Sequence, residues 1–200
     1  WRVPHFEKML YDNAQLMGVY ALAGRICSRP DFTRTAINTA EYVLRDLRIN
    51  TADGRLLGYA SAEDADDPGG EGSFYAWSPA QLDAVLGAEV AGPLAEEWDL
   101  RPGESELGAS GHPEPVTSHI PHPRGAGIAK LAAARGCTAQ ELRARWEDHL
   151  PKLRQARATR PRPSRDDKVL TDLNGLLLSG LAAVARYADA SYTAALAELA

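Results

Sequence analysis

Two helical patterns near the start of the chain are separated by only three residues. Apolar residues return at intervals of three and four from Pro4 to about Cys27, and again over the stretch that follows Asp31. Pro4 suits the first position of a helix, and Asp31 suits the cap of the next one. Because the break Ser28-Arg29-Pro30 is so short, the two helices must lie antiparallel as a hairpin.

Helix signals recur along the rest of the chain. Capping boxes, in which two side chains each bond to the other residue's backbone N–H, begin at Ser78 and at Thr138. Thr171 can cap a final apolar helix. Pro93 is expected to interrupt one helical stretch, and Pro151 is expected to kink another. This succession of helices predicts a mainly α fold built from helical hairpins.

The periodicity changes between residues 53 and 77. Asp53-Gly54 is a turn signal, and the stretches 56–59 and 74–77 are read as two short strands. An acidic, glycine-rich loop separates them. We therefore expect a short β-hairpin insertion among the helices. Residues 99–125 are rich in Gly, Pro, Ser and His and are expected to form a long irregular loop.

Composition excludes several classes of function. The chain has 22 Lys and Arg against 27 Asp and Glu, and this net charge of −5 argues against nucleic acid as the main partner. No stretch approaches the roughly 18 uncharged apolar residues of a membrane helix. Cys27 and Cys137 form neither a disulfide framework nor a CxxC pair, which favours a reducing cytoplasm. Pro121 separates His119 from His122, so no metal site is expected there, and no cofactor is predicted.

Polar residues gather in the expected start of the first helix, at 4–13. His5 and Asp12 are two helical turns apart and would share one face, and Lys8 and Asp12 could pair at i, i+4. Glu7 lies in the same segment. The alternative interpretation is a solvated face on which Glu7 interacts with the helix dipole.

The acidic loop is a second candidate segment. Its carboxylates repel one another and therefore need a cation, Arg or Lys partners, or solvent. A calcium loop fails, because Pro68 and Tyr75 occupy ligand positions. A carboxylate pair for general acid and base catalysis and a merely solvated loop both remain open. The acidic residues are Glu63, Asp64, Asp66, Asp67 and Glu71.

The third candidate segment is 166–175. Asn174 falls in the first turn after Thr171, where it either supplements the helix cap or faces a cavity that suits oxygens or anions. A nearby row of arginines is expected to be a solvated face. It comprises Arg154, Arg157, Arg160, Arg162 and Arg165.

These three segments carry a resemblance to a known family. WRVPHFEKMLYDNAQL, SAEDADDPGGEGSFYAWSPAQL and DDKVLTDLNGLLLSGLA resemble the large thioredoxin-domain-containing proteins of the spermatogenesis-associated type. The resemblance implies a thioredoxin-like domain upstream, followed by an (α/α)6 toroid similar to that of N-acylglucosamine 2-epimerases and six-hairpin glycosidases. The chain opens on Trp1 rather than Met, and residues 1–200 are expected to be part of that toroid, truncated at both ends.

The resemblance also implies a carbohydrate site. An epimerase or isomerase would use His5 as acid and base with a carboxylate partner, whereas a glycosidase-like hydrolase would use two carboxylates, from Asp12 and the acidic loop. The implied catalytic residues are His5, Asp12, Glu63 and Asp64. The implied substrate-binding residues are Glu7, Lys8, Asp66, Glu71, Tyr75, Trp77, Lys168 and Asn174.

One motif departs from the family pattern. Asp172 and Leu173 stand where the family usually has a small residue and Trp before Asn-Gly-Leu. The expected partner is a sugar-like small molecule, not nucleic acid and not a membrane. Two alternatives remain: a non-catalytic scaffold that presents clients to the thioredoxin-like domain, and a degenerate, inactive copy.

Overall fold

The computed structural model describes residues 4–100, 119–121 and 127–200, which fall into two compact units. The first, here called the hairpin unit, comprises Glu7–Asp64 and Ser164–Ala200. The second, here called the insert unit, comprises Trp1–Phe6 and Ala65–Pro163. Each unit has its own hydrophobic core.

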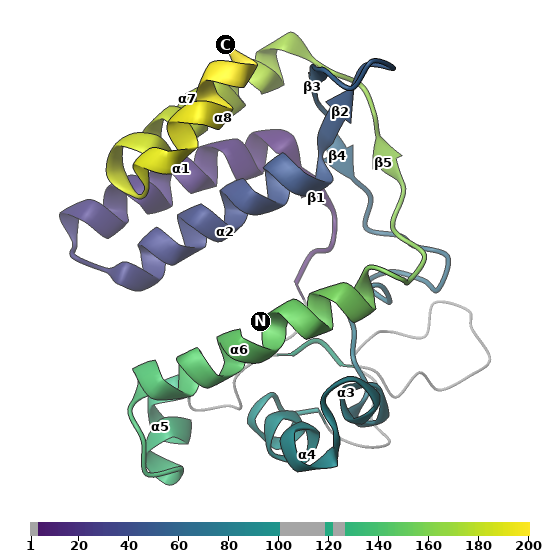
Figure 1. Ribbon diagram of the computed structural model, residues 1–200, viewed down its shortest axis with the longest axis vertical. Helices are drawn as coiled ribbons and strands as arrows, with labels where there is room; N and C mark the ends of the chain where they lie inside the picture. Colours follow the sequence, from purple (N-terminus) through teal and green to yellow (C-terminus); the bar gives the residue numbers. More distant parts are fainter. Residues whose placement is uncertain (1–3, 101–118, 122–126) are drawn as a thin grey trace. The chain divides into compact units, whose positions relative to one another are not determined.

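The hairpin unit is built from helices packed side by side (Figure 1). Helix α1 packs against both α2 and α7, and a 3-10 turn joins α7 to the short α8. The bounds are α1 Leu10–Ile26, α2 Pro30–Asp46, α7 Thr171–Tyr187, the 3-10 turn Ala190–Tyr192 and α8 Thr193–Leu199. The core is formed by Leu10, Ala14, Met17, Ala21, Ala36, Ala40, Val43, Leu47, Tyr59, Ala60, Leu177, Leu181 and Val184.

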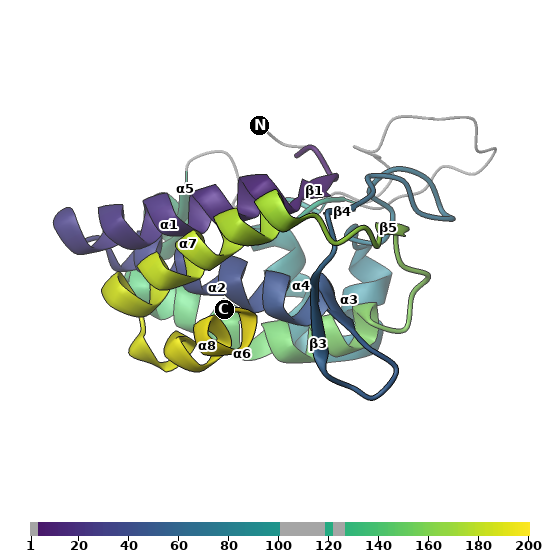
Figure 2. The ribbon, with the colours of Figure 1, turned by 90° about the horizontal axis from the view of Figure 1, so that it is seen from above.

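Helices α1 and α7 run alongside each other at very close range (Figure 2). A Cβ atom added to Gly180 would lie 2.3 Å from the carbonyl oxygen of Ala14. On the facing helix, a Cβ added to Gly18 would meet the Cβ of Ala183 at 3.7 Å. Glycine and alanine at this crossing therefore allow the two backbones to approach, and the larger side chains pack on either side of them.

Two small antiparallel sheets lie in the hairpin unit, at the ends of these helices (Figure 1). One consists of β2 and β3, joined through the predicted turn at Gly54. The other has the strand order β1-β4-β5, which brings together three segments distant in sequence. The bounds are β1 Lys8–Met9, β2 Arg48–Asn50, β3 Leu56–Tyr59, β4 Ala62–Glu63 and β5 Arg165–Asp166.

The insert unit is also helical. Both predicted capping boxes are present, at Ser78 before α3 and at Thr138 before α6. Trp98 packs edge-to-face on Trp146, with ring centroids 6.2 Å apart. Trp77 forms an isolated antiparallel bridge with His119. The helix bounds are α3 Pro79–Leu86, α4 Ala88–Glu97, α5 Gly127–Ala134 and α6 Ala139–Arg157.

Several sequence-based expectations are confirmed. Helices α1 and α2 form the antiparallel hairpin, α7 follows at the predicted place, and 56–59 is a strand. The chain is mainly helical with small β-sheets, as expected. Residues 101–118 and 122–125 of the predicted long loop, including His122, lie outside the described residues.

Other expectations are wrong. Pro4 does not begin a helix, because Lys8 and Met9 pair with strand β4 and α1 starts only at Leu10. Asp31 lies inside the first turn of α2, where it bonds to Arg29, the N-cap residue. The segment 74–77 forms turns rather than a strand, apart from the single bridge at its end.

Neither internal proline stops its helix. Pro93 lies within α4 and Pro151 lies within α6, and both helices continue past them. A proline in a helix interior costs about 3 kcal/mol. The apolar residues buried just after each proline, Leu94 and Leu153, provide packing that offsets this cost. None of the helices in the described residues has the length and apolarity needed to cross a membrane.

Candidate functional site

A buried carboxylate lies on the central strand of the three-stranded sheet. Strand β4 places Glu63 directly opposite Lys8 of β1, and Lys8 Nζ lies 3.5 Å from Glu63 Oε1. The Glu63 side chain is only 2% exposed, whereas that of Lys8 is 26% exposed. Buried carboxylates need charged or hydrogen-bonding partners. Lys8 therefore supplies a countercharge that also reaches solvent, and the pair can accept and donate hydrogen bonds at one place.

Further polar residues lie in the edge strand β5 and on either side of it. Ser164 Oγ donates to Asp64 Oδ2 at 3.2 Å, and Lys168 Nζ lies 3.0 Å from Asp166 Oδ2. The hydrogen bond from Lys168 lowers the pKa of the Asp166 carboxyl, and Ser61 adds to this effect. Three of the predicted site residues, Glu63, Asp64 and Lys168, thus belong to β4, β5 and the segments that adjoin them.

Asn174 has a structural role that joins helix α7 to strand β3. Its Oδ1 accepts the backbone N–H of Tyr59 at 2.9 Å, and its Nδ2 donates to the carbonyl oxygens of Tyr59 at 3.1 Å and Leu170 at 2.9 Å. Both amide hydrogens are therefore used by the backbone. This geometry extends the predicted cap role and leaves Asn174 no donor for a ligand in a cavity.

The Tyr59 ring beside this amide is completely buried. Burial raises the pKa of its phenol, an effect that the nearby Arg48 partly opposes. A raised pKa in the folded state means that Tyr59 contributes full stability below the unfolded value of about 10, and that this stability is lost as the pH rises further. We expect the free energy of unfolding to fall above about pH 10.

Urea unfolding at several alkaline pH values, with and without Tyr59→Phe, measures this effect. The variant should show a shallower loss of stability with pH, because it has no phenol to ionise. Equal slopes for the two proteins would contradict the assignment.

The first predicted segment is not organised as the helix that the sequence suggested. His5 and Glu7 are exposed and precede α1, so the spacing of seven residues does not place His5 and Asp12 on one helix face. Lys8 lies on β1, so the helical spacing to Asp12 does not apply, and its ion pair is with Glu63. Asp12 is exposed in the first turn of α1.

In the insert unit, Asp67 organises the acidic loop. Its Oδ1 accepts hydrogen bonds from the Ser73 hydroxyl and, at 2.8 Å, from the Gly69 N–H, and its Oδ2 accepts from the Phe74 N–H at 2.7 Å. The carboxylate therefore fixes the loop through neutral donors. Asp66 and Glu71 are exposed. No group of three potential metal ligands occurs within the described ranges.

The two predicted aromatic residues pack against other side chains of the insert unit. Phe6 stacks on Tyr75 with centroids 5.9 Å apart and an interplanar angle of 8°. Trp77 is buried, and the guanidinium of Arg160 lies 4.2 Å from its ring centroid. One ring face of Trp77 is therefore already covered, and Tyr75 is contacted by both Phe6 and the guanidinium of Arg157, which lies 5.2 Å from its ring centroid. Tyr75 and Trp77 stabilise the insert unit in addition to any contact with a ligand.

A groove of about 460 Å³ in the insert unit lies next to Arg160. The sequence predicted a solvated arginine face, but Arg160 is half-buried and donates to two backbone carbonyls 84 and 86 residues away. No periodicity in the sequence reports contacts at that separation. The groove is lined by Asp67, Pro68, Gly69, Ser73, Phe74, Ala76, Gln81, Arg160 and Pro161.

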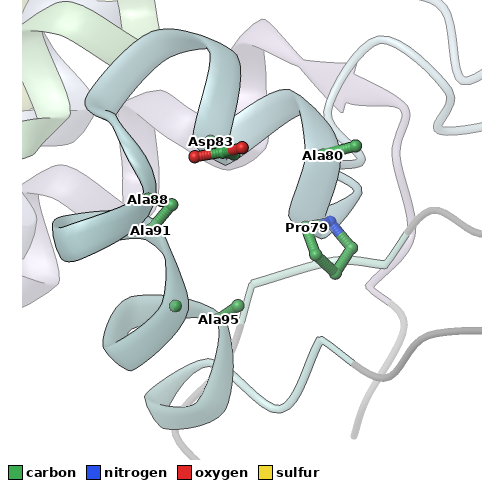
Figure 3. Close-up of a pocket in the computed structure, with 7 residues that line it drawn as sticks. Pro79, Ala80, Asp83, Ala88, Ala91 and Ala95 are labelled. Carbon is green, nitrogen blue, oxygen red and sulfur yellow. The ribbon is translucent and has the colours of Figure 1, made fainter.

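A second hollow, of about 290 Å³, lies between α3 and α4 (Figure 3). Asp83 supplies the one charge among its lining residues, which are otherwise Pro79, Ala80, Ala88, Ala91, Gly92 and Ala95. Ligand sites combine an apolar lining with several placed polar groups. This hollow has too few of them to orient a ligand.

Comparison with known proteins identifies relatives across most of the chain. No protein-family model matches it. The chain is 35% identical over 198 residues to mouse spermatogenesis-associated protein 20, and 34% identical over 204 residues to the human protein. It is homologous to part of that protein. A Caenorhabditis elegans protein of uncharacterized function is 30% identical over 202 residues. The mouse and human matches each cover 91% of this chain, which spans about a quarter (24%) of the length of those two relatives.

Proposed function

We propose that the chain is part of a carbohydrate-binding or carbohydrate-converting protein, in which its helical hairpins belong to an (α/α)6 toroid that follows a thioredoxin-like domain. The single observation that carries the proposal is the Lys8–Glu63 pair, because a 2% exposed carboxylate beside a partly exposed ammonium places a hydrogen-bond acceptor and a donor together. Homology to part of spermatogenesis-associated protein 20 agrees with the family resemblance from which the toroid was inferred.

The pair provides two complementary functions toward a sugar. The Glu63 carboxylate accepts a hydrogen bond from a hydroxyl, and in a converting enzyme it takes a proton from the substrate and returns it. The Lys8 ammonium donates to a neighbouring oxygen and stabilises negative charge that develops there. Asp64, which directly follows Glu63 and bonds to Ser164 just before β5, adds a second carboxylate in the same unit.

The proposal predicts that Glu63→Gln weakens sugar binding about tenfold or more, because the amide cannot replace a charged acceptor. A panel of neutral monosaccharides and amino sugars should be titrated into the full-length protein by calorimetry, with thermal shifts as a second readout. If the protein converts the sugar, the same change should lower turnover by about a hundredfold or more.

Glu198→Gln is a matched control. Glu198 is a glutamate of the same unit that pairs with Arg48, but its side chain is 46% exposed. The control should bind sugars as the unchanged protein does. The proposal is wrong if no sugar binds the unchanged protein, or if Glu63→Gln binds as tightly as the control.

A second function is favoured by the outer surface of α1. Four large aliphatic side chains lie exposed along this helix: Leu16, Val19, Leu22 and Ile26, with Ile26 72% exposed. Such a row suits a non-catalytic scaffold that presents protein clients to a thioredoxin-like domain. A flat sugar panel, together with trapping of a client through a mixed disulfide, would favour this scaffold. A degenerate copy would bind no sugar and would trap no client.

A further inference from the structure

Arg160 is held rigidly by the backbone of the insert unit. Its Nη1 donates to the carbonyl oxygens of Phe74 at 2.9 Å and Ala76 at 2.6 Å. The Trp77 ring covers one face of the guanidinium, 4.2 Å away. A side chain fixed in this way loses little further conformational entropy when it binds a ligand.

These contacts leave the other edge of the guanidinium available. Arginine has five N–H donors in one plane, and Nη1 carries only two of them. Within the described part of the chain, the hydrogen-bond acceptors of Arg160 are those two carbonyl oxygens, and Nη1 donates to both. The Nε and Nη2 hydrogens lie side by side, in the arrangement that pairs with the two oxygens of a carboxylate or phosphate.

The charges around Arg160 favour an anion. Burial lowers the pKa of its guanidinium, the positive charge of Arg157 lowers it further, and Asp67 opposes both effects. Asp67 already accepts three hydrogen bonds from its own loop. Arg157 and Arg162 lie over the Phe74 ring, each 5.3 Å from its centroid. Among the lining residues, Arg160 carries the one positive charge and Asp67 the one negative charge, and Arg157 and Arg162 lie over Phe74, which lines the same groove.

The remaining lining residues add a donor and an apolar wall. Gln81 uses its Oε1 to accept the Ser78 N–H in the capping box, so its amide nitrogen is not needed there. Phe74 and Pro161 line the same groove, whose volume of about 460 Å³ can hold a small organic molecule.

We infer that this groove binds the carboxylate or phosphate group of a small organic anion, with the Nε–Nη2 edge of Arg160 and the Gln81 amide as donors. The apolar wall formed by Phe74 and Pro161 contacts the apolar part of the ligand. This site belongs to the insert unit alone, and it does not rest on the proposed sugar chemistry of the Lys8–Glu63 pair.

Benzoate and inorganic phosphate are suitable probes, because one offers a carboxylate on an apolar ring and the other a bare phosphate. Each should be titrated into the full-length protein by calorimetry, with uncharged benzamide as the neutral comparison. We expect one or both anions to bind and benzamide not to bind. The two anions together show which oxyanion the groove prefers.

Gln81→Glu is the decisive variant. It removes the amide donor and adds a negative charge, yet glutamate at this position still completes the capping box, so α3 should remain folded. Anion affinity should fall about tenfold or more. Gln140→Glu makes the same chemical change at an exposed site in the first turn of α6 and should have no effect.

Arg160→Lys tests the paired Nε and Nη2 donors, because lysine keeps the positive charge but cannot present two parallel donors. It should also weaken binding about tenfold. Arg154→Gln, at an exposed arginine on α6, is its control. The inference is overturned if neither anion binds, if benzamide binds as well as benzoate, or if a folded Gln81→Glu protein binds as the Gln140→Glu control does.

Discussion

Replacing Gly180 with alanine is expected to destabilise the hairpin unit by about 2 to 3 kcal/mol. The new Cβ would lie 2.3 Å from the Ala14 carbonyl oxygen and 3.1 Å from its carbonyl carbon. The first contact is shorter than van der Waals packing permits, and it involves backbone rather than the end of a flexible side chain. Helices α1 and α7 must therefore separate, which loosens the packing of Met17 and its neighbours in the core.

The same substitution at Gly175 of α7 is expected to act in the opposite direction. Nothing lies within 4 Å of a Cβ placed there, and the residue is exposed. Alanine is favoured over glycine in a helix by about 0.5 to 1 kcal/mol, so Gly175→Ala should stabilise the protein by up to that amount. Both variants replace glycine with alanine in the same helix and gain the same helix propensity. They differ only in the atoms that the new methyl group contacts.

Urea unfolding followed by circular dichroism measures both changes. A Gly180→Ala protein as stable as Gly175→Ala would show that the close crossing of α1 and α7 does not exist as described. Two destabilised variants would instead show that α7 is not a regular helix at Gly175.

Local signals predicted the helices well. Signals only a few residues long predicted the capping boxes at Ser78 and Thr138 and the hairpin of α1 and α2. All three are present in the structure. The same kind of signal was misleading where a segment distant in sequence forms hydrogen bonds with the residues concerned. Pro4 looked like a helix start, but strand β4 pairs with Lys8 and Met9 and keeps the chain extended up to Leu10.

The segment 74–77 shows the same limit for strands. Its aromatic residues have high β-propensity, which justified the prediction. In the structure, Asp67 accepts the Phe74 N–H, and the N–H of Tyr75 bonds back to the Gly72 carbonyl at 3.0 Å. These hydrogen bonds curl the segment into turns. Propensity could not report them, because they depend on how the preceding loop folds.

The candidate site was only partly predictable for a related reason. Glu63 and Lys8 were both singled out, but their pairing was not, because two-residue strands leave no periodic pattern. The role of Arg160 was missed, because its carbonyl acceptors lie 84 and 86 residues earlier. Chemistry-bearing residues can thus be recognised from sequence by type and local motif, whereas their partners follow from tertiary structure.

Asn174 provides the second large effect. Asn174→Ala is expected to destabilise the protein by about 2 to 4 kcal/mol, because the N–H and carbonyl of Tyr59 would lose their partner in a buried setting. Leu170 would also lose one donor to its carbonyl. Ser179→Ala on the same helix removes a single exposed hydrogen bond, to Gly175, and should change stability by less than about 0.5 kcal/mol.

The size of this loss separates the two roles that the sequence left open for Asn174. A residue that serves the backbone lowers stability when it is truncated, with or without ligand present. A residue that faces a ligand cavity leaves the stability of the free protein nearly unchanged and weakens binding instead. Because both amide hydrogens and Oδ1 are engaged by Tyr59 and Leu170, we expect the first result. Urea unfolding of Asn174→Ala and Ser179→Ala, both without ligand, decides between the two roles. Equal stabilities of the two variants would show that Asn174 does not serve the backbone and would favour a role in ligand binding.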